Sequence, residues 1–117
     1  MNKQVIVLED DREIREMVEY ILSEEHLEVR SFEKVEKFWK AIDSIHSDLF
    51  LLDIMLPDGN GLEVCKQLRL QKKTQHIPII IMSAHFSAVE GECNPADFIR
   101  KPFDVDDFIG TIHRIIA

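Results

Sequence analysis

The chain has 117 residues, the size of a single domain, and we expect one domain over residues 1–117. Its 22 acidic and 14 basic residues give a net charge of −8, which disfavours direct binding to nucleic-acid phosphates or to anionic membrane surfaces. No apolar run approaches the roughly 20 residues that span a bilayer, and no signal-peptide core follows Met1, so we predict a soluble, cytoplasmic protein.

The first third of the chain predicts two strands that alternate with two helices. The apolar residues 5–8 (Val-Ile-Val-Leu) indicate a buried strand, and three acidic residues (9–11) follow it. Apolar residues then recur with helical spacing over residues 14–22, and Asp11 is a suitable N-cap for that helix. Residues 27–32 alternate as an outer strand does, and residues 35–45 repeat the helical spacing.

A buried strand in the middle of the chain ends at an acidic residue. Residues 49–52 (Leu-Phe-Leu-Leu) are all apolar, as in a parallel strand covered on both faces. Asp53 follows directly, where open α/β sheets place their ligand sites. Pro57, Gly59 and Gly61 favour a tight turn into the next helix. Taken alone, Asp53 fits a local turn or helix cap equally well.

The second half of the chain continues the alternation of strands and helices. The predicted elements are a helix over residues 62–68 capped by Asn60, a strand over residues 77–82 that ends at Ser83, a strand over residues 97–100 that runs into Lys101, and a helix over residues 105–116 capped by Asp104. Cys65 and Cys93 lack metal-ligand spacing, which favours a reducing compartment, and we expect Cys65 to be a small apolar core residue.

This alternation predicts an α/β fold with a doubly wound, five-stranded parallel sheet and helices on both faces. The carboxyl ends of parallel strands meet at one edge of the sheet. Every predicted strand except the second ends there in polar residues, namely Glu9, Asp10, Asp53, Ser83 and Lys101. Helix capping alone does not explain this convergence, so we predict a functional site at that edge.

The residue types at this edge favour phosphoryl chemistry. Three neighbouring carboxylates repel one another unless a cation joins them, and Mg²⁺ prefers one or two carboxylates together with water and phosphate oxygens. Lys101 adds a compact positive charge and Ser83 a hydroxyl donor, both suited to phosphoryl oxygens. An aspartate can also act as a nucleophile and form an aspartyl phosphate. The set therefore indicates a site for phosphoryl transfer.

On these residues the chain resembles the receiver domain of two-component response regulators, including chemotaxis regulators, over all 117 residues. The matching pieces are Val7-Leu8-Glu9-Asp10-Asp11, the turn Asp53-x-x-Leu-Pro-Asp-x-x-Gly61, Met82-Ser83-Ala84 and Lys101-Pro102-Phe103. Each piece is weak singly, but their order on these strands is specific. The resemblance implies a flavodoxin-like sheet of order 2-1-3-4-5, and a phosphorylation-dependent switch in which Asp53 accepts a phosphoryl group from the phosphohistidine of a histidine kinase or phosphotransfer protein.

The resemblance also implies a role for each residue at the edge. Asp10, Asp53 and the backbone carbonyl of Met55 would hold Mg²⁺, and Glu9 would act partly through water. Ser83 and Lys101 would follow the phosphoryl group, whereas Phe98 would be the aromatic residue that turns inward on activation.

The chain departs from the family pattern at three places. Glu9 replaces the commoner Asp, and Phe98 lacks the hydroxyl of the frequent Tyr. The segment between Ser83 and Lys101 is about one helical turn shorter than in family members. We therefore expect a shortened fourth helix limited to residues 87–92, and favour a monomer because the fourth helix often forms part of the dimer face.

Two other functions compete with the switch. A phosphatase could form the same phosphoaspartate, but such enzymes resemble a pattern with a second Asp two residues after the nucleophile, and Met55 stands there. A structural interaction module without phosphorylation is the other alternative. The output of a switch would pass to a downstream protein or to a fused effector domain, because the chain is either a stand-alone regulator or a receiver cut from a longer protein.

Overall fold

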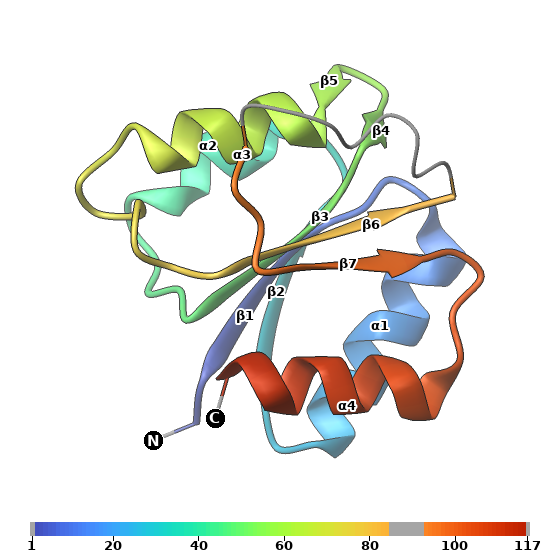
Figure 1. Cartoon of the computed structure of the whole chain (residues 1–117). Helices are drawn as coiled ribbons and strands as arrows, with labels where there is room; N and C mark the ends of the chain where they lie inside the picture. Colours follow the sequence, from blue (N-terminus) through green and yellow to red (C-terminus); the bar gives the residue numbers. More distant parts are fainter. Residues whose placement is uncertain (1, 85–92, 117) are drawn as a thin grey trace.

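A five-stranded parallel sheet forms the centre of the computed structural model, which describes residues 2–84 and 93–116 (Figure 1). Its strands are β1 (Gln4–Leu8), β2 (Glu28–Phe32), β3 (Leu49–Asp53), β6 (Ile79–Ser83) and β7 (Asp97–Arg100). They are arranged in the order β2-β1-β3-β6-β7, and every pair in this sheet is parallel. The predicted order 2-1-3-4-5 is therefore confirmed, since β4 and β5 lie outside this sheet.

Of the helices in the described part of the chain, two lie on each face of the sheet (Figure 1). The helices α1 (Arg12–Glu24) and α4 (Val105–Ile116) lie on one face, and α2 (Val35–Ile42) and α3 (Gly61–Arg69) lie on the other. Successive strand residues point to opposite faces, so the sheet separates two apolar cores. Val5 and Val7 belong to the core beside α1 and α4, whereas Ile6 and Leu8 belong to the core beside α2 and α3. This double coverage explains why the central strands are apolar throughout.

The predicted N-caps hold three of the helices in place. Asp11 Oδ1 accepts a hydrogen bond from the Ile14 amide at 3.0 Å, and Asn60 Oδ1 accepts one from the Leu62 amide at 2.7 Å. In the same way Asp104 accepts from the amide of Asp107 at 2.9 Å. Each carboxylate or amide oxygen satisfies a helix N–H that has no partner within its own helix.

Some element boundaries differ from the sequence prediction. Asp53 and Ser83 are the last residues of their strands rather than the residues that follow them. The second helix ends at Ile42 and not at residue 45. The turn after Asp53 contains two short antiparallel strands, β4 (Met55–Leu56) and β5 (Gly59–Asn60), that the sequence did not predict. The shortened fourth helix expected over residues 87–92 lies outside the described residues.

The two cysteines correct another expectation. Cys65 is fully buried, as predicted, but its sulfur is bonded to that of Cys93 in a disulfide, with 5.7 Å between the two Cα atoms. The cysteines are 28 residues apart, and no local spacing announces the pair. The parallel order β3-β6-β7 brings the segment before β7 against α3, so only the tertiary structure reveals the bond.

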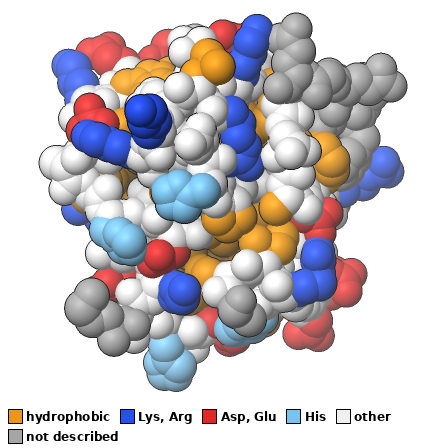
Figure 2. All heavy atoms as spheres, turned by 60° about the vertical axis from the view of Figure 1, so that its left-hand side comes forward, with side chains coloured by type: hydrophobic (Ala, Val, Ile, Leu, Met, Phe, Trp, Pro, Cys, Tyr) orange, Lys and Arg blue, Asp and Glu red, His pale blue; other side chains and the backbone are white. Residues whose placement is uncertain are grey.

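On the face that Figure 2 shows, charged side chains of both signs are interspersed, and histidines and hydrophobic patches lie among them. His26, His46, His76 and His113 are all exposed. Within residues 2–84 and 93–116, no helix combines the length and apolarity that crossing a bilayer requires.

Two glycines give a matched test of how closely the start of α3 packs against the backbone of Asp53. A Cβ on Gly61 would lie 1.9 Å from the backbone oxygen of Asp53, whereas a Cβ on Gly110, inside α4, meets no atom within 4 Å. We expect Gly61→Ala to lower the free energy of unfolding by about 1–3 kcal/mol, since the Asp53 backbone must shift. Gly110→Ala should raise it by about 1 kcal/mol, because alanine is the better helix former. Denaturant unfolding measures both, and equal shifts in the two variants would contradict the close approach at Gly61.

Candidate functional site

The strand register brings the predicted polar residues to one edge of the sheet. Leu8 pairs with Leu52, and Ser83 pairs with Arg100, so the ends of β1, β3, β6 and β7 are aligned. An open pocket of about 320 Å³ lies at this edge. Its lining residues are Glu9, Asp10, Asp11, Ile14, Asp53, Met55, Ser83, Ala84 and Lys101. All the predicted site residues except Phe98 therefore meet in one pocket.

Three carboxylates form the acidic part of the pocket. Glu9, Asp10 and Asp53 each contribute one oxygen, and these oxygens all lie within 4.8 Å of one another. Glu9 is fully buried and Asp53 is 8% exposed, whereas Asp10 is open to solvent. A cluster of hard oxygen donors with one open side fits a Mg²⁺ ion that keeps some of its water ligands. The donor set thus fits the predicted metal without any change of residue.

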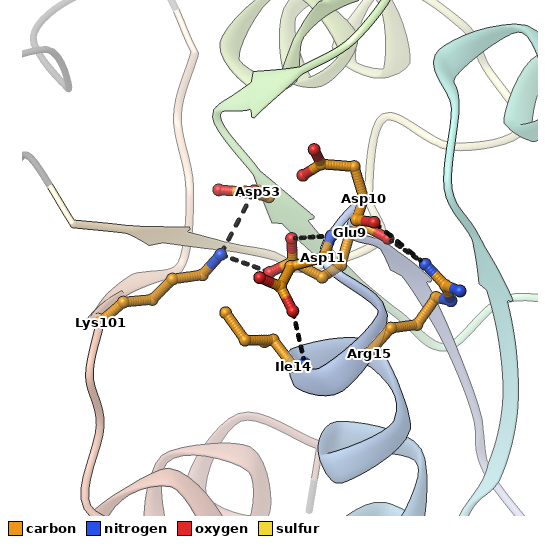
Figure 3. A network of polar contacts seen from close by, with 7 residues as sticks. All are labelled: Glu9, Asp10, Asp11, Ile14, Arg15, Asp53 and Lys101. Carbon is orange, nitrogen blue, oxygen red and sulfur yellow. Dashed lines mark hydrogen bonds and ion pairs between the residues drawn. The ribbon is translucent and has the colours of Figure 1, made fainter.

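Lys101 lies between two of these carboxylates (Figure 3). Its Nζ donates to Glu9 Oε1 in a close ion pair and lies 3.2 Å from Asp53 Oδ2. The lysine side chain is only 14% exposed, so solvent screens these interactions weakly. The two carboxylates in turn raise the pKa of Lys101 above its ordinary value, although burial opposes them. The ammonium group is therefore firmly charged and offsets part of the repulsion within the cluster.

Glu9 is the most constrained acid of the cluster. Its Oε2 accepts a hydrogen bond from the Asp11 amide at 3.2 Å, and its own amide donates to the Phe32 carbonyl at 3.0 Å. Burial raises the pKa of Glu9 to about 7, helped by the nearby Asp53 and opposed by the hydrogen bond from Lys101. The glutamate side chain, one methylene longer than that of aspartate, reaches Lys101 from a fully buried position.

Arg15 supports the acidic segment from α1, and the sequence analysis missed it. Its Nη1 donates to the backbone carbonyls of Glu9 at 3.1 Å and Asp10 at 3.3 Å (Figure 3). The guanidinium thereby holds the chain between β1 and α1 by two carbonyl contacts. In the sequence, only the position of Arg15 near the start of the helix hinted that it could reach the acidic segment.

Asp58 secures the loop that follows Asp53, and the sequence analysis missed this role too. Its two carboxylate oxygens accept hydrogen bonds from the amides of Val35 at 2.8 Å and Glu36 at 3.0 Å, at the start of α2. These contacts lower the pKa of Asp58. Lys34, which precedes α2, provides no side-chain cap, so a residue of the β4–β5 hairpin caps this helix instead. The hairpin is thereby tied to a second element besides α3.

Met55, Ser83 and Phe98 occupy different parts of this edge. Met55 lines the pocket with a side chain that is largely exposed. Ser83 lines the same pocket and is only 5% exposed. The Ser83 carbonyl accepts a hydrogen bond from the Lys101 amide at 2.9 Å, which joins the ends of β6 and β7. Phe98 lies outside this pocket and lines a separate hollow with Phe103 and Phe108.

Comparisons with known proteins agree with this arrangement. The family model of the response regulator receiver domain matches residues 5–113. The chain is 37% identical over 117 residues to the DNA-binding transcriptional regulator NtrC of Proteus hauseri, a match that covers 97% of this chain and 24% of that protein. The response regulator ArlR of Staphylococcus aureus is 33% identical over 115 residues, a match that covers 97% of this chain and 52% of that protein. The chain thus spans only part of each of these relatives.

Solved structures show the same fold. A protein from Chloroflexus aurantiacus described as a response regulator superposes with a TM-score of 0.93 at 26% identity, covering 100% of this chain and 99% of that one. The receiver domain of the sensor histidine kinase PA1611 of Pseudomonas aeruginosa gives a TM-score of 0.87 at 20% identity, with 99% and 98% covered. That structure has magnesium coordinated in its active-site cleft.

The raised pKa of Glu9 predicts how the stability of the metal-free protein depends on pH. Because the folded-state pKa of about 7 exceeds the ordinary value of 4.5, the folded protein binds more protons between these values. The resulting stabilisation is complete below the unfolded-state pKa and is lost as the pH rises towards the folded-state pKa. We expect a loss of at most about 3 kcal/mol from this group. Unfolding of wild type and Glu9→Gln should diverge across this window in chelator, and parallel curves would contradict the assignment.

The crowding of the carboxylates predicts a gain in stability when one is removed. In metal-free buffer, Asp10→Asn should raise the melting temperature by a few degrees, because it removes one like charge from the cluster. Mg²⁺ should stabilise the wild type and have less effect on this variant. Asp43→Asn, which changes an exposed carboxylate remote from the pocket, is the control and should respond to Mg²⁺ as the wild type does. A clear loss of stability in metal-free Asp10→Asn would count against the cluster.

Proposed function

Because this chain belongs to the response regulator receiver domain family, the receiver domains of two-component signalling, we propose that Asp53 is its phosphoacceptor. The observation that carries the proposal is the contact of one lysine with two acids. Lys101 Nζ lies 3.2 Å from Asp53 Oδ2 and pairs with Glu9, in a pocket that also contains Asp10 and Ser83. Receiver domains are phosphoacceptor signalling domains rather than classical enzymes, and the proposed function is that of a phosphorylation-dependent switch.

The proposed reaction transfers a phosphoryl group from a phosphohistidine of a histidine kinase or phosphotransfer protein. A carboxylate oxygen of Asp53 forms a bond to phosphorus, while the bond between phosphorus and the imidazole nitrogen breaks and leaves its electron pair on that nitrogen. Asp53 is suited to this attack because it lines an open pocket and, although mostly buried, keeps 8% of its surface exposed there. Its position at the end of β3 keeps the carboxylate at a defined place on a rigid element.

Lys101 and Ser83 are proposed to bind the transferred group. Lys101 can exchange its contact with Asp53 for a phosphoryl oxygen at little cost, because both partners are anions and the side chain is flexible. The Ser83 hydroxyl is a donor for a second phosphoryl oxygen, and it lies in the same pocket. Phe98, on β7, is proposed to change its packing when these contacts form.

Asp10, Asp53 and the Met55 carbonyl are proposed to hold Mg²⁺, with Glu9 acting partly through water. When bound, this ion neutralises charge on the phosphoryl oxygens during transfer. The carboxylate oxygens within 4.8 Å of one another support this assignment. Among the described residues, Lys101 supplies the only side-chain cation in contact with Asp53.

We further propose a cytoplasmic monomer that binds neither nucleic acid nor membranes directly. The net charge of −8 supports the absence of such binding, because it repels phosphate backbones and anionic lipid surfaces. The activated domain would signal to a downstream protein or to a fused effector domain, since the curated relatives extend beyond the matched part. A phosphatase activity is not favoured, because Met55 cannot protonate a leaving group from its place two residues after Asp53.

Replacement of Asp53 tests the proposal. In the presence of Mg²⁺, wild type should take up label from phosphorylated kinase or from acetyl phosphate, whereas Asp53→Asn should remain at background because its amide is not a nucleophile. Asp104→Asn is the matched control, since asparagine also caps helices and the residue lies outside the pocket. Uptake by Asp53→Asn at the wild-type rate would refute the assignment, and continuous phosphate release from simple esters by the wild type would favour the phosphatase.

A further inference from the structure

We propose that Cys65 and Cys93 form a dithiol–disulfide redox site that reacts with low-molecular-weight disulfides of the glutathione class. The structure joins the two sulfurs, and the Cα separation of 5.7 Å lies in the range that a disulfide spans without backbone movement. In a reducing compartment such a bond is reversible and is usually regulatory rather than structural. The site is distinct from the carboxylate pocket, whose lining contains neither cysteine.

The unequal burial of the two cysteine residues predicts the order of reaction. Cys65 lies in α3 and is fully buried, whereas Cys93 precedes β7 and is partly exposed. Cys93, the less buried cysteine, is therefore the one that meets an external disulfide. Cys65 lies within bonding reach of Cys93 and acts as the resolving thiol.

The reaction can be written with all atoms and electrons accounted for. The Cys93 thiolate attacks one sulfur of glutathione disulfide, which forms a mixed disulfide and releases one glutathione thiolate. The Cys65 thiolate then attacks Cys93 Sγ and displaces the second glutathione. Two protein thiols lose two protons and two electrons, and one glutathione disulfide is reduced to two glutathione molecules.

The disulfide has a structural consequence at the start of β7. Arg69, one turn after Cys65 on α3, donates from Nη2 to the Asn94 carbonyl at 3.0 Å. Its Nη1 donates to the Ile77 carbonyl at 2.7 Å and to the Gln75 carbonyl at 3.0 Å. Two consecutive residues, Cys93 and Asn94, are thus held on α3, one by a covalent bond and the other by a guanidinium. Reduction removes the covalent contact and leaves the hydrogen bond of Arg69.

This tether is expected to change both global and local stability. A disulfide that closes a loop of 28 residues restricts the unfolded chain, and a domain of this size should gain roughly 10 °C in melting temperature on oxidation. Locally, the Ala96 amide donates to the Ile79 carbonyl at 2.7 Å, where β7 joins β6. Its hydrogen exchange should slow about tenfold or more on oxidation, because opening of this end must then displace α3 as well.

The test equilibrates the whole chain with glutathione buffers over a range of ratios and measures intact mass. We expect wild type to change from two thiols to an internal disulfide, with a mass lower by two hydrogens and no retained glutathione. Cys65→Ser should instead accumulate one glutathione on Cys93, whereas Cys93→Ser should react far more slowly because Cys65 is buried. None of these measurements involves phosphoryl transfer, so failure here and failure of the proposed function are separate results.

Three outcomes would overturn the redox site. The first is a wild type that keeps two thiols across the whole buffer range. The second is glutathione adduction of Cys93→Ser as fast as that of Cys65→Ser. The third is an oxidised wild type whose Ala96 amide exchanges as fast as in the reduced protein, with the Arg15 amide of α1, hydrogen-bonded to Asp11, as the reference that oxidation leaves unchanged.

Discussion

The contact of Lys101 with Glu9 and Asp53 is the interaction on which the site depends. The parallel sheet brings acidic residues from two strands to one edge, where two of them are almost completely buried. Buried like charges destabilise a fold unless a counter-charge accompanies them. The lysine that follows β7 provides that charge, from a position 92 residues away from Glu9 in sequence. The site thus couples the two ends of the chain through one side chain.

The backbone around the acids is held by contacts that do not involve the three carboxylates of the cluster. Arg15 binds the carbonyls of Glu9 and Asp10, and Asp58 binds the first amides of α2. Gly61 lets α3 begin directly against the Asp53 carbonyl, and its amide donates to the Ile54 carbonyl at 2.8 Å. These residues position the reactive groups without competing for them. This separation suits the proposed function, in which the site binds and releases a cation and a phosphoryl group.

Helix α3 links this site to the disulfide. The helix starts at Gly61, beside the Asp53 backbone, and carries Cys65 and Arg69 on the turns that follow. Through these two residues it binds the segment that enters β7, and β7 leads to Lys101. Helix α3 therefore contacts both the backbone of Asp53 and the segment that leads through β7 to Lys101. A redox-dependent bond at this place acts on the framework of the site rather than on its reacting atoms.

The fold class and most of the site followed from the sequence alone. Short apolar runs, helical spacing and capping residues are local signals, and they identified the five main strands and the polar residues at their ends. The order of the strands was implied by the resemblance to receiver domains. The contacts of Asp58 with α2, of Arg15 with two carbonyls, and of Cys65 with Cys93 required the tertiary structure. Each joins groups whose pairing depends on how the elements pack, and sequence spacing carries no information on that packing. The raised pKa of Glu9 also required the tertiary structure, because its main cause is burial, which is a property of the folded chain.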